Sequence, residues 1–183
     1  MTEHRIALRE LTRIAICAAA MAVCAWVTIP STVPFTMQTM GVFLSLRLLG
    51  GRNGTIAVAV YILLGLVGLP VFSGFQAGAG VLLGPTGGYI VGFLFIGLIY
   101  WLGEPLKPGR IVSCALLTGG LAVCYAFGTA WFIRVNAAKG KTLTVLASLG
   151  ICVFPYIVPD LLKLAASEVI AWRVLKLSER KRV

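Results

Sequence analysis

Six apolar segments follow one another along the chain, with only short connections between them. They cover roughly residues 11–30, 36–49, 54–69, 86–102, 111–133 and 156–175. Charged residues make up only 12% of the chain, about half of their share in a soluble domain. The connections are too short and too apolar to form a separate water-soluble domain. The sequence therefore predicts an all-α integral membrane protein with six transmembrane helices, in which residues 1–183 form a single transmembrane domain.

Several of these segments are short for a membrane span. The second has about 14 residues, which as a helix extends about 21 Å, less than the ~30 Å hydrocarbon core of a bilayer. The third and fourth segments are also short. We expect these helices to be kinked, sunk into the bundle, or extended by snorkelling side chains such as Arg47.

The formal net charge of +10 comes largely from basic residues at the ends of the apolar segments. Such residues orient a membrane protein and meet anionic lipid headgroups, and no aromatic residues alternate with them as in nucleic-acid-binding sites. With both termini in the cytoplasm, twelve of the sixteen basic residues lie inside and three outside, while Lys163 lies within a span. The inside residues are Arg5, Arg9, Arg13, Arg47, Arg52, Lys107, Arg110, Arg173, Lys176, Arg180, Lys181 and Arg182, and the outside ones Arg134, Lys139 and Lys141. The charge distribution therefore predicts cytoplasmic termini, contact with membrane lipid and no nucleic-acid partner.

The sequence contains no recognisable catalytic, metal or nucleotide motif. The five cysteines lie in apolar segments without a CxxC pair, which is typical of small buried hydrophobic residues. The single histidine, His4, lies in the polar start of the chain. The GKT at 140–142 lacks the glycine that a phosphate loop needs five positions earlier, because Val135 is there. We expect no metal site, no cofactor, no catalytic residues and no ATP hydrolysis by this chain.

In this orientation the connections at residues 30–39 and 69–89 lie outside. The second is rich in glycine and contains no charged residue, whereas a solvated loop is usually polar. Backbone that is not helical is tolerated at membrane depth only against protein or a cavity. We expect a re-entrant or lid-like segment that forms a pocket wall; the alternative is a loosely packed loop.

The last segment places three charged residues, Asp160, Lys163 and Glu168, among apolar ones. One charge at the centre of an inserting helix costs about 2.5–3.5 kcal/mol, so these side chains must face inward or lie near a helix end. A helix that begins near Pro159 places Asp160 and Lys163 near the outer mouth, with residues 142–152 as a separate outer helix. Asp160 and Lys163 share a face with Ser167, and Glu168 points elsewhere. The pair is either a structural link between helices or the polar part of an apolar ligand site.

Small residues recur every four positions at two places. Ala15, Ala18, Ala19 and Ala22 do so in the first segment, and Gly84, Gly88 and Gly92 around the fourth. Such spacing lets another helix approach closely. Packing within the bundle and docking of an external partner are both open for the alanines, and internal packing is favoured for the glycines.

Three stretches of this chain resemble one known family. They are VPFTMQTMG at 33–41, GLPVFSGFQAGAGVLLGPTGGYIVGF at 68–93 and PDLLK at 159–163. In order and spacing, over most of the chain, they are similar to the BioY family, the biotin-specific S-components of energy-coupling factor (ECF) transporters.

The resemblance implies a six-helix protein of a bacterial or archaeal cytoplasmic membrane. Such a protein captures biotin on the outer side and delivers it together with a coupling transmembrane subunit and two ATPase subunits. The implied substrate-binding residues are Asp160, Lys163, Tyr89, Gln76, Gln38, Phe35, Phe75, Gly84 and Gly87, with Gln76 where some members have asparagine. The residues implied in docking to the coupling subunit are Ala15, Ala18, Ala19 and Ala22.

The residue types suit biotin. A carboxylate can accept from the ureido N–H groups, a lysine can donate to the ureido carbonyl, and aromatic rings can cover the apolar ring system. Three alternatives are an S-component for another vitamin, a membrane-embedded enzyme that uses Asp160 and Glu168, and a structural or assembly protein without a ligand.

Overall fold

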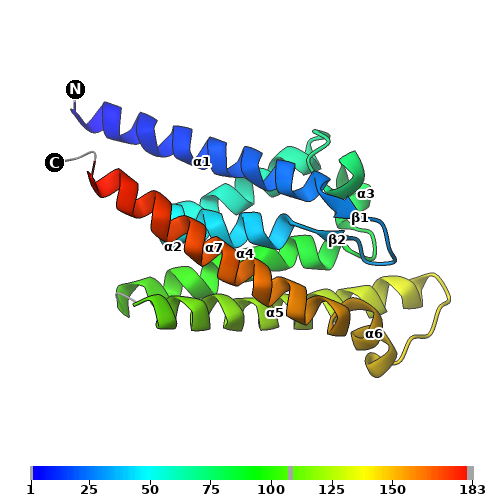
Figure 1. Cartoon of the computed structure of the whole chain (residues 1–183). Coiled ribbons are helices and arrows are strands. Elements are labelled where there is room, and N and C mark those ends of the chain that lie inside the picture. Colours follow the sequence, from blue (N-terminus) through cyan, green and yellow to red (C-terminus); the bar gives the residue numbers. More distant parts are fainter. Residues whose placement is uncertain (1, 107–108, 181–183) are drawn as a thin grey trace.

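The structure, a computed structural model, describes residues 2–106 and 109–180, and the side chains of residues 7–105 and 109–177. Its elements are α1 (Thr2–Trp26), β1 (Thr28–Ile29), β2 (Phe35–Thr36), α2 (Gln38–Leu66), η1 (Ser73–Phe75), α3 (Ala79–Leu82), α4 (Gly87–Gly103), η2 (Glu104–Leu106), α5 (Arg110–Ala138), α6 (Val145–Cys152) and α7 (Phe154–Arg180). Lys107, Lys181 and Arg182, which supported the predicted orientation, lie outside the described residues, as do the side chains of His4, Arg5 and Arg180. The expected all-α fold is confirmed, with long helices side by side (Figure 1).

The helix α2 is a hairpin rather than one straight rod. Its backbone leaves the helical conformation at Gly50, with φ 79° and ψ 174°, a region that essentially only glycine occupies. A Cβ atom on Gly54 would lie 2.8 Å from the Cα of Leu46, whereas residues eight apart in a straight helix are about 12 Å apart. The halves therefore run antiparallel, and the chain reverses where cyan turns to teal in Figure 1. The predicted break between residues 49 and 54 exists, but it is confined to Gly50.

The helices α4 and α5 approach each other closely through glycines on both sides. A Cβ atom on Gly88 would lie 2.3 Å from Trp131, and one on Gly92 would lie 2.6 Å from Cys124. On the other helix, a Cβ atom on Gly128 would lie 2.2 Å from the Tyr89 ring. Gly88 and Gly92 of the glycine stripe therefore pack inside the bundle, as favoured above, whereas Gly84 lies in the turn before α4.

The alanines of α1 divide between two faces. Ala18 and Ala22 are buried in the core that α1 forms with α2, whereas Ala15 and Ala19 are exposed. A side chain in the core cannot also meet a partner, so the structure leaves only Ala15 and Ala19 on a face open to docking. Their role stays a prediction.

The start of α7 differs from the prediction. The helix begins at Phe154, so Pro155 takes the first turn, where proline fits, and Pro159 lies inside the helix. The expected separate outer helix is α6, whose N-cap Thr144 accepts a hydrogen bond from the Ala147 N–H at 3.3 Å. A bend of 40° at Val153 separates α6 from α7. The predicted start of this helix near Pro159 was therefore wrong by about one and a half turns.

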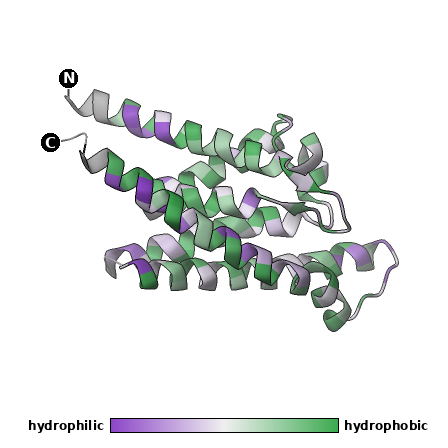
Figure 2. Cartoon of the chain, in the orientation of Figure 1, coloured by the Kyte–Doolittle hydropathy of each residue, from purple (hydrophilic) through white to green (hydrophobic). Residues whose placement is uncertain are grey.

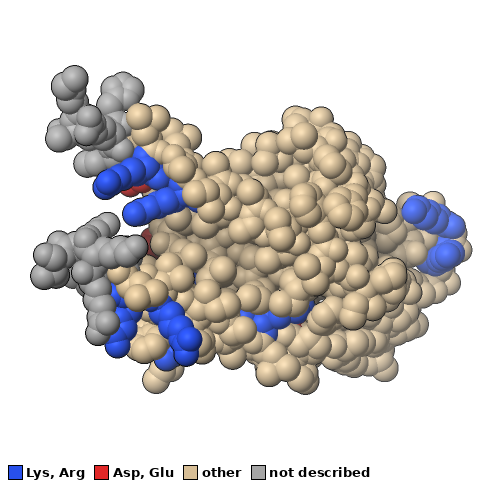
Figure 3. Space-filling model, turned by 45° about the horizontal axis from the view of Figure 1, so that its top comes forward, with Lys and Arg blue, Asp and Glu red and all other residues tan. Residues whose placement is uncertain are grey.

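Both termini lie at one end of the bundle, and the β1–β2 connection, α3 and α6 lie at the other (Figure 1). Hydrophobic residues cover most of the length between the ends (Figure 2). Basic residues gather at the end with the termini, and a smaller group lies at the far end (Figure 3). By length and composition, α2 and α5 could cross a membrane, as could α6 and α7 if they count as one bent span. Because α2 is a hairpin, it consists of two shorter antiparallel helices on either side of Gly50 instead of one straight helix.

Candidate ligand-binding site

A cavity opens near the end of the bundle opposite the termini, bordered by the β1–β2 connection, the loop after α2, and helices α2, α4, α5, α6 and α7. The space between its walls, counted together with the open solvent at its mouth, is about 650 Å³. Its lining is mixed, with apolar walls and a group of polar side chains, as in many ligand sites. The lining residues are Val33, Pro34, Thr36, Gln38, Thr39, Ser73, Thr86, Tyr89, Ile90, Phe93, Leu121, Cys124, Tyr125, Cys152, Tyr156, Asp160 and Lys163.

Asp160 is held in this lining by three donors from three helices. Its Oδ1 accepts from the Thr39 hydroxyl at 2.8 Å and from the Lys163 ammonium at 2.7 Å. Its Oδ2 accepts from the Tyr125 hydroxyl at 2.5 Å. The side chain is only 4% exposed, and charge-assisted bonds of this kind stabilise a buried carboxylate. Asp160 therefore connects α7 to α2 and α5 while it borders the cavity.

Lys163 lies one turn further along α7 and is also buried. Besides its ion pair with Asp160, its Nζ donates to the Thr36 carbonyl at 2.6 Å. The same ammonium lies 4.2 Å from the centre of the Phe35 ring, within the range of a cation–π contact. The pair therefore links helices, which is one of the two alternatives that the sequence left open, and it also borders the cavity, so the ligand-site alternative stays a prediction.

Gln38 is fixed at the start of α2. Its side-chain amide donates to the Tyr61 hydroxyl at 2.7 Å, and Tyr61 donates in turn to the Val71 carbonyl at 3.1 Å. This chain of bonds ties both halves of the α2 hairpin to the loop that follows it. Since this bond uses one of the two amide N–H groups, the Gln38 side chain has a second N–H to donate to a ligand and a carbonyl oxygen to accept from one.

Tyr89 lines the cavity from the first turn of α4, and its hydroxyl pairs with that of Thr129 on α5 at 3.0 Å. Gly84 and Gly87 shape the turn before this helix and do not line the cavity. The Gly84 carbonyl accepts from the Trp131 indole at 3.0 Å, and a Cβ atom on Gly87 would lie 1.8 Å from the Leu82 carbonyl oxygen. The two glycines thus position Tyr89 and Thr86 through the backbone.

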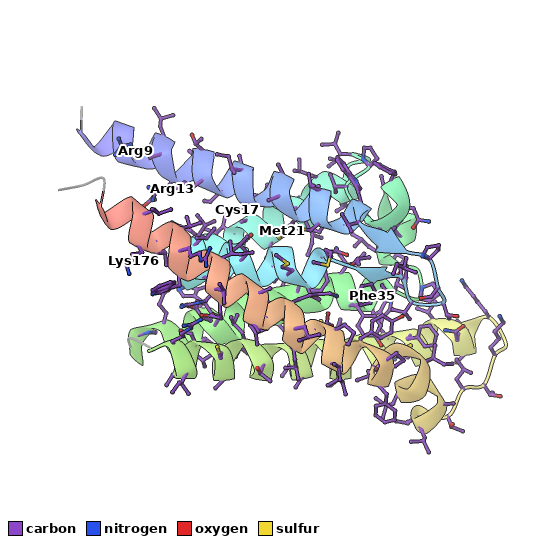
Figure 4. The ribbon with its side chains drawn as sticks, viewed as in Figure 1. Arg9, Arg13, Cys17, Met21, Phe35 and Lys176 are labelled. Atoms are coloured by element: carbon purple, nitrogen blue, oxygen red, sulfur yellow. The ribbon has the colours of Figure 1, made fainter. Side chains whose placement is uncertain are left out.

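The structure places Gln76, Phe75 and Phe35 outside the cavity lining. Gln76 is exposed at the end of η1 and contacts Phe72 through the backbone. Phe75 is 63% exposed and stacks on Trp26, with ring centres 5.0 Å apart. Phe35 reaches the site indirectly, through Lys163 and through stacking on Tyr156; Figure 4 shows it beside α7. Their predicted roles in binding stay predictions.

The glycine-rich loop after α2 lies at the cavity edge. Ser73 lines the cavity and pairs with the Thr28 hydroxyl at 3.0 Å, and the Trp26 indole donates to the Pro70 carbonyl at 2.8 Å. The loop is thus attached to the end of α1 and forms part of the wall, as expected for a lid-like segment.

Glu168 belongs to a different place from Asp160, as its position on the helix predicted. Its Oε1 lies 2.5 Å from the Arg47 Nε, and its Oε2 lies 4.0 Å from the Arg110 Nε. Along α7, eight residues separate it from Asp160, or about 12 Å. The two carboxylates therefore cannot act together on one small substrate.

Reasoning from the sequence missed Thr39, Tyr125, Thr36 and Tyr156. Tyr125 lies in the middle of an apolar segment, 35 residues from the carboxylate that it contacts. Thr36 and Thr39 are adjacent to Phe35 and Gln38, two residues that were considered, and this proximity was the available signal. Tyr125 and Tyr156 depend on the register between helices, which apolar patterning does not determine.

An apolar helical bundle with a buried ion pair at the wall of a mixed cavity defines a membrane protein that binds a small molecule. Comparison with known proteins gives the family. The BioY family model matches residues 1–180, so the chain belongs to the BioY family, and the resemblance seen in the sequence is confirmed.

Two relatives and one solved structure illustrate the similarity. The chain is 39% identical over 171 residues to the biotin transporter BioY of Thermotoga maritima, covering 93% of this chain and 98% of the relative. It is 36% identical over 168 residues to a probable biotin transporter BioY of Pyrococcus horikoshii, covering 91% and 96%. The crystal structure of an S-component for biotin from an ECF-type ABC transporter superposes with a TM-score of 0.84 at 28% identity, covering 94% of this chain and 93% of that one.

Proposed function

We propose that this chain binds biotin in the cavity beside Asp160 and Lys163 and takes it into the cell as the S-component of an ECF transporter. Family membership and the names of the relatives support this function. The observation that carries the assignment of the site is the buried Asp160–Lys163 pair in the lining of a cavity with largely apolar walls. A buried charged pair without a ligand is costly to maintain, and a polar ligand would add hydrogen bonds to it.

The hydrogen bonds that Asp160 and Lys163 already make limit which ligand group can bind to this pair. A carboxylate has about four lone-pair positions, and the described residues occupy three of them on Asp160. The Lys163 ammonium has three protons, and two are donated to Asp160 and Thr36. One acceptor position, on the Asp160 Oδ2, and one Lys163 proton therefore remain in this pair. The ureido group of biotin presents an N–H next to a carbonyl, which matches that arrangement.

The apolar walls support the other half of the ligand. Ile90, Phe93 and Leu121 line the cavity from α4 and α5, and they offer a surface for the fused rings and the thioether. Riboflavin and thiamine carry a large flat ring system and a fixed positive charge, respectively. A small site with a balanced ion pair disfavours both, so another vitamin is the weaker alternative.

The chain is a transport protein and not an enzyme, because its family consists of transport components. We further propose that its ECF module contains a coupling transmembrane subunit and two ATPase subunits, that Ala15 and Ala19 face the coupling subunit, and that no metal or cofactor takes part. The exposed small residues of α1 support this docking face, since small side chains allow close helix contact.

The proposed topology has six spans in one transmembrane domain, with both termini in the cytoplasm. The reversal at Gly50 supports two passes within α2. The shared end of the termini and the basic residues gathered there support the orientation (Figure 3). Biotin would then enter from the outside, at the end where the cavity lies.

Direct binding tests the proposed function. The purified full-length protein in detergent is titrated with tritiated biotin, and unlabelled biotin, riboflavin and thiamine are added as competitors. We expect saturable binding that only unlabelled biotin displaces. Displacement by riboflavin or thiamine would indicate another vitamin, and the absence of binding to any of them would contradict the proposal.

A further inference from the structure

A second hollow lies at the end of the bundle that carries the termini, far from the cavity described above. It encloses about 810 Å³, including its open mouth. Arg47 of α2 and Arg110 at the start of α5 line one side, and Glu168, Trp172, Leu175 and Lys176 of α7 line the other. Lys176 lies near the terminal end of α7, on the side towards α5 (Figure 4). We call these six residues the basic cleft.

The charges in the basic cleft do not balance. Arg47, Arg110 and Lys176 are opposed by the single carboxylate of Glu168, so three positive charges and one negative charge leave +2. Glu168 is committed to Arg47 at 2.5 Å and lies further from Arg110, at 4.0 Å. Arg110 is 56% exposed, and Lys176 is exposed as well. Two cations therefore face the cleft with incomplete neutralisation, and an anion between them would restore balance.

Apolar surface continues directly from these cations. Trp172 is 50% exposed, with the Lys176 ammonium 4.8 Å from the centre of its ring. Leu175 is 39% exposed and Leu177 is 60% exposed. A smaller adjoining hollow shares Trp172 and Lys176 and adds Arg173 and Leu177. Tryptophan is typical of the membrane–water interface, where one end of the ring is apolar and the other is wet.

We propose that the basic cleft binds the phosphate group of an anionic phospholipid from the cytoplasmic leaflet, with the phosphate between Arg110 and Lys176. The shared chemistry is that of a phosphate anion. A lipid fits better than free phosphate because Trp172 and the leucines offer acyl chains a surface beside the cations. Basic pockets between helices on the cytoplasmic side are sites where anionic headgroups bind. The assignment to the cytoplasmic leaflet rests on the orientation proposed above, whereas the assignment of the binding residues does not.

Quenching of tryptophan fluorescence measures this binding. The full-length protein is reconstituted in phosphatidylcholine bilayers that contain increasing amounts of phosphatidylglycerol with brominated acyl chains. Brominated phosphatidylcholine is the comparison lipid, and Trp172→Phe separates the signal of Trp172 from that of the other three tryptophans. We expect a preference for phosphatidylglycerol near Trp172 of about fivefold for each cation that faces it, and a weaker preference at high salt.

Charge removal at matched positions provides the control. Arg110→Gln combined with Lys176→Gln should abolish the preference. Arg9→Gln combined with Arg13→Gln removes the same charge from exposed positions of α1 at the same end of the bundle, and should leave it unchanged. Lys176→Gln alone, at an exposed site, should lower the preference even if the double variant does not fold. Biotin binding reports folding in every case, since its proposed site lies at the other end.

Three outcomes would overturn the proposal. One is an equal preference in the wild type and the basic-cleft variants, and another is no preference in the wild type while biotin still binds. The third is loss of the lipid preference when millimolar inorganic phosphate is added at constant ionic strength, which would assign the cleft to free phosphate. Failure of biotin binding with an intact lipid preference would count against the proposed function alone.

Discussion

The buried carboxylate of Asp160 depends on neighbours that lie far from it in the sequence. Thr39 and Tyr125 donate to it from α2 and α5, and Lys163 donates from its own helix. Each donor occupies a lone pair that would otherwise lack a partner in apolar surroundings, where an unpaired charge is costly. Together these donors orient the carboxylate edge that borders the cavity.

Tyr125→Phe tests that positioning role. The change removes one hydroxyl from Asp160 and leaves the ring, so we expect biotin affinity to fall by about tenfold, as hydrogen bonds to charged groups contribute about 1.5–3 kcal/mol. Isothermal titration of the purified variant measures the change. Tyr100→Phe is the control, because its hydroxyl accepts from Arg47 in another part of the bundle. Equal losses in the two variants would contradict a specific role for Tyr125.

Asp160, Lys163, Tyr89 and Gln38 were predicted for the site from the sequence, and the structure brings all four to one cavity. The charged pair was recognisable because charges are rare in apolar segments, and the resemblance to the BioY family implied Tyr89 and Gln38. Tyr125 could not be found in this way, since a tyrosine in an apolar helix is unexceptional. Gln76 and Phe75 lie outside the cavity because the loop turns them outward, and such a turn depends on tertiary contacts.

At the scale of the element, Gly50 determines where α2 reverses. Its backbone conformation is open only to glycine, and the Gly51 N–H that follows donates to Glu104 at 3.0 Å. Apolar patterning predicted a break in this region, between the segments at 36–49 and 54–69, but it could not identify the residue. The early start of α7 was missed for a related reason, because two prolines each suit a first turn.

Gly50→Ala should destabilise the protein. A side chain there costs about 1–3 kcal/mol in backbone strain, and its Cβ atom would lie 2.6 Å from the Glu104 carboxylate. We expect a lower midpoint of thermal unfolding in detergent. Gly119→Ala is the matched control, since Gly119 lies within α5 and a Cβ atom there would contact nothing within 4 Å. An unchanged midpoint for Gly50→Ala would show that the reversal does not need glycine.

The two faces of α1 should respond differently to larger side chains. Ala15→Leu and Ala19→Leu, on the exposed face, should preserve biotin binding and impair uptake in cells that contain the coupling and ATPase subunits. Ala18→Leu, in the core, should lower stability instead, since overpacking typically costs about 1–3 kcal/mol. Ala20→Leu is an exposed control about 100° around the helix from Ala19. Normal uptake by both exposed-face variants would remove the docking role.

At the scale of the whole molecule, polar groups are divided between two ends. The Asp160 cluster and its cavity lie at one end, and the Glu168 cluster with the basic cleft lies at the other. The sequence predicted only that Glu168 does not share a face with Asp160 on α7. It did not predict the cleft, since Arg47, Arg110 and Lys176 are far apart in the chain and were considered only as topology signals.

The proposed topology predicts which end reacts with reagents added to intact cells. In a variant without native cysteines, Lys141→Cys should react with a membrane-impermeant maleimide, and Arg110→Cys should react only after the membrane is permeabilised. Arg110 is the first residue of α5, and Lys141 lies just beyond the other end of that helix. Labelling of Arg110→Cys in intact cells, with Lys141→Cys protected, would reverse the orientation.

The most direct test of the account compares biotin dissociation constants for the wild type, Asp160→Asn and Glu168→Gln. Both variants replace a buried carboxylate on α7 with an amide, but only Asp160 borders the cavity. Loss of one member of a buried charged hydrogen bond costs about 2–5 kcal/mol, so Asp160→Asn should weaken biotin binding by about thirtyfold or more, while the folded Glu168→Gln protein should bind as the wild type does. Wild-type affinity in Asp160→Asn would contradict the central claim that this carboxylate holds the ligand.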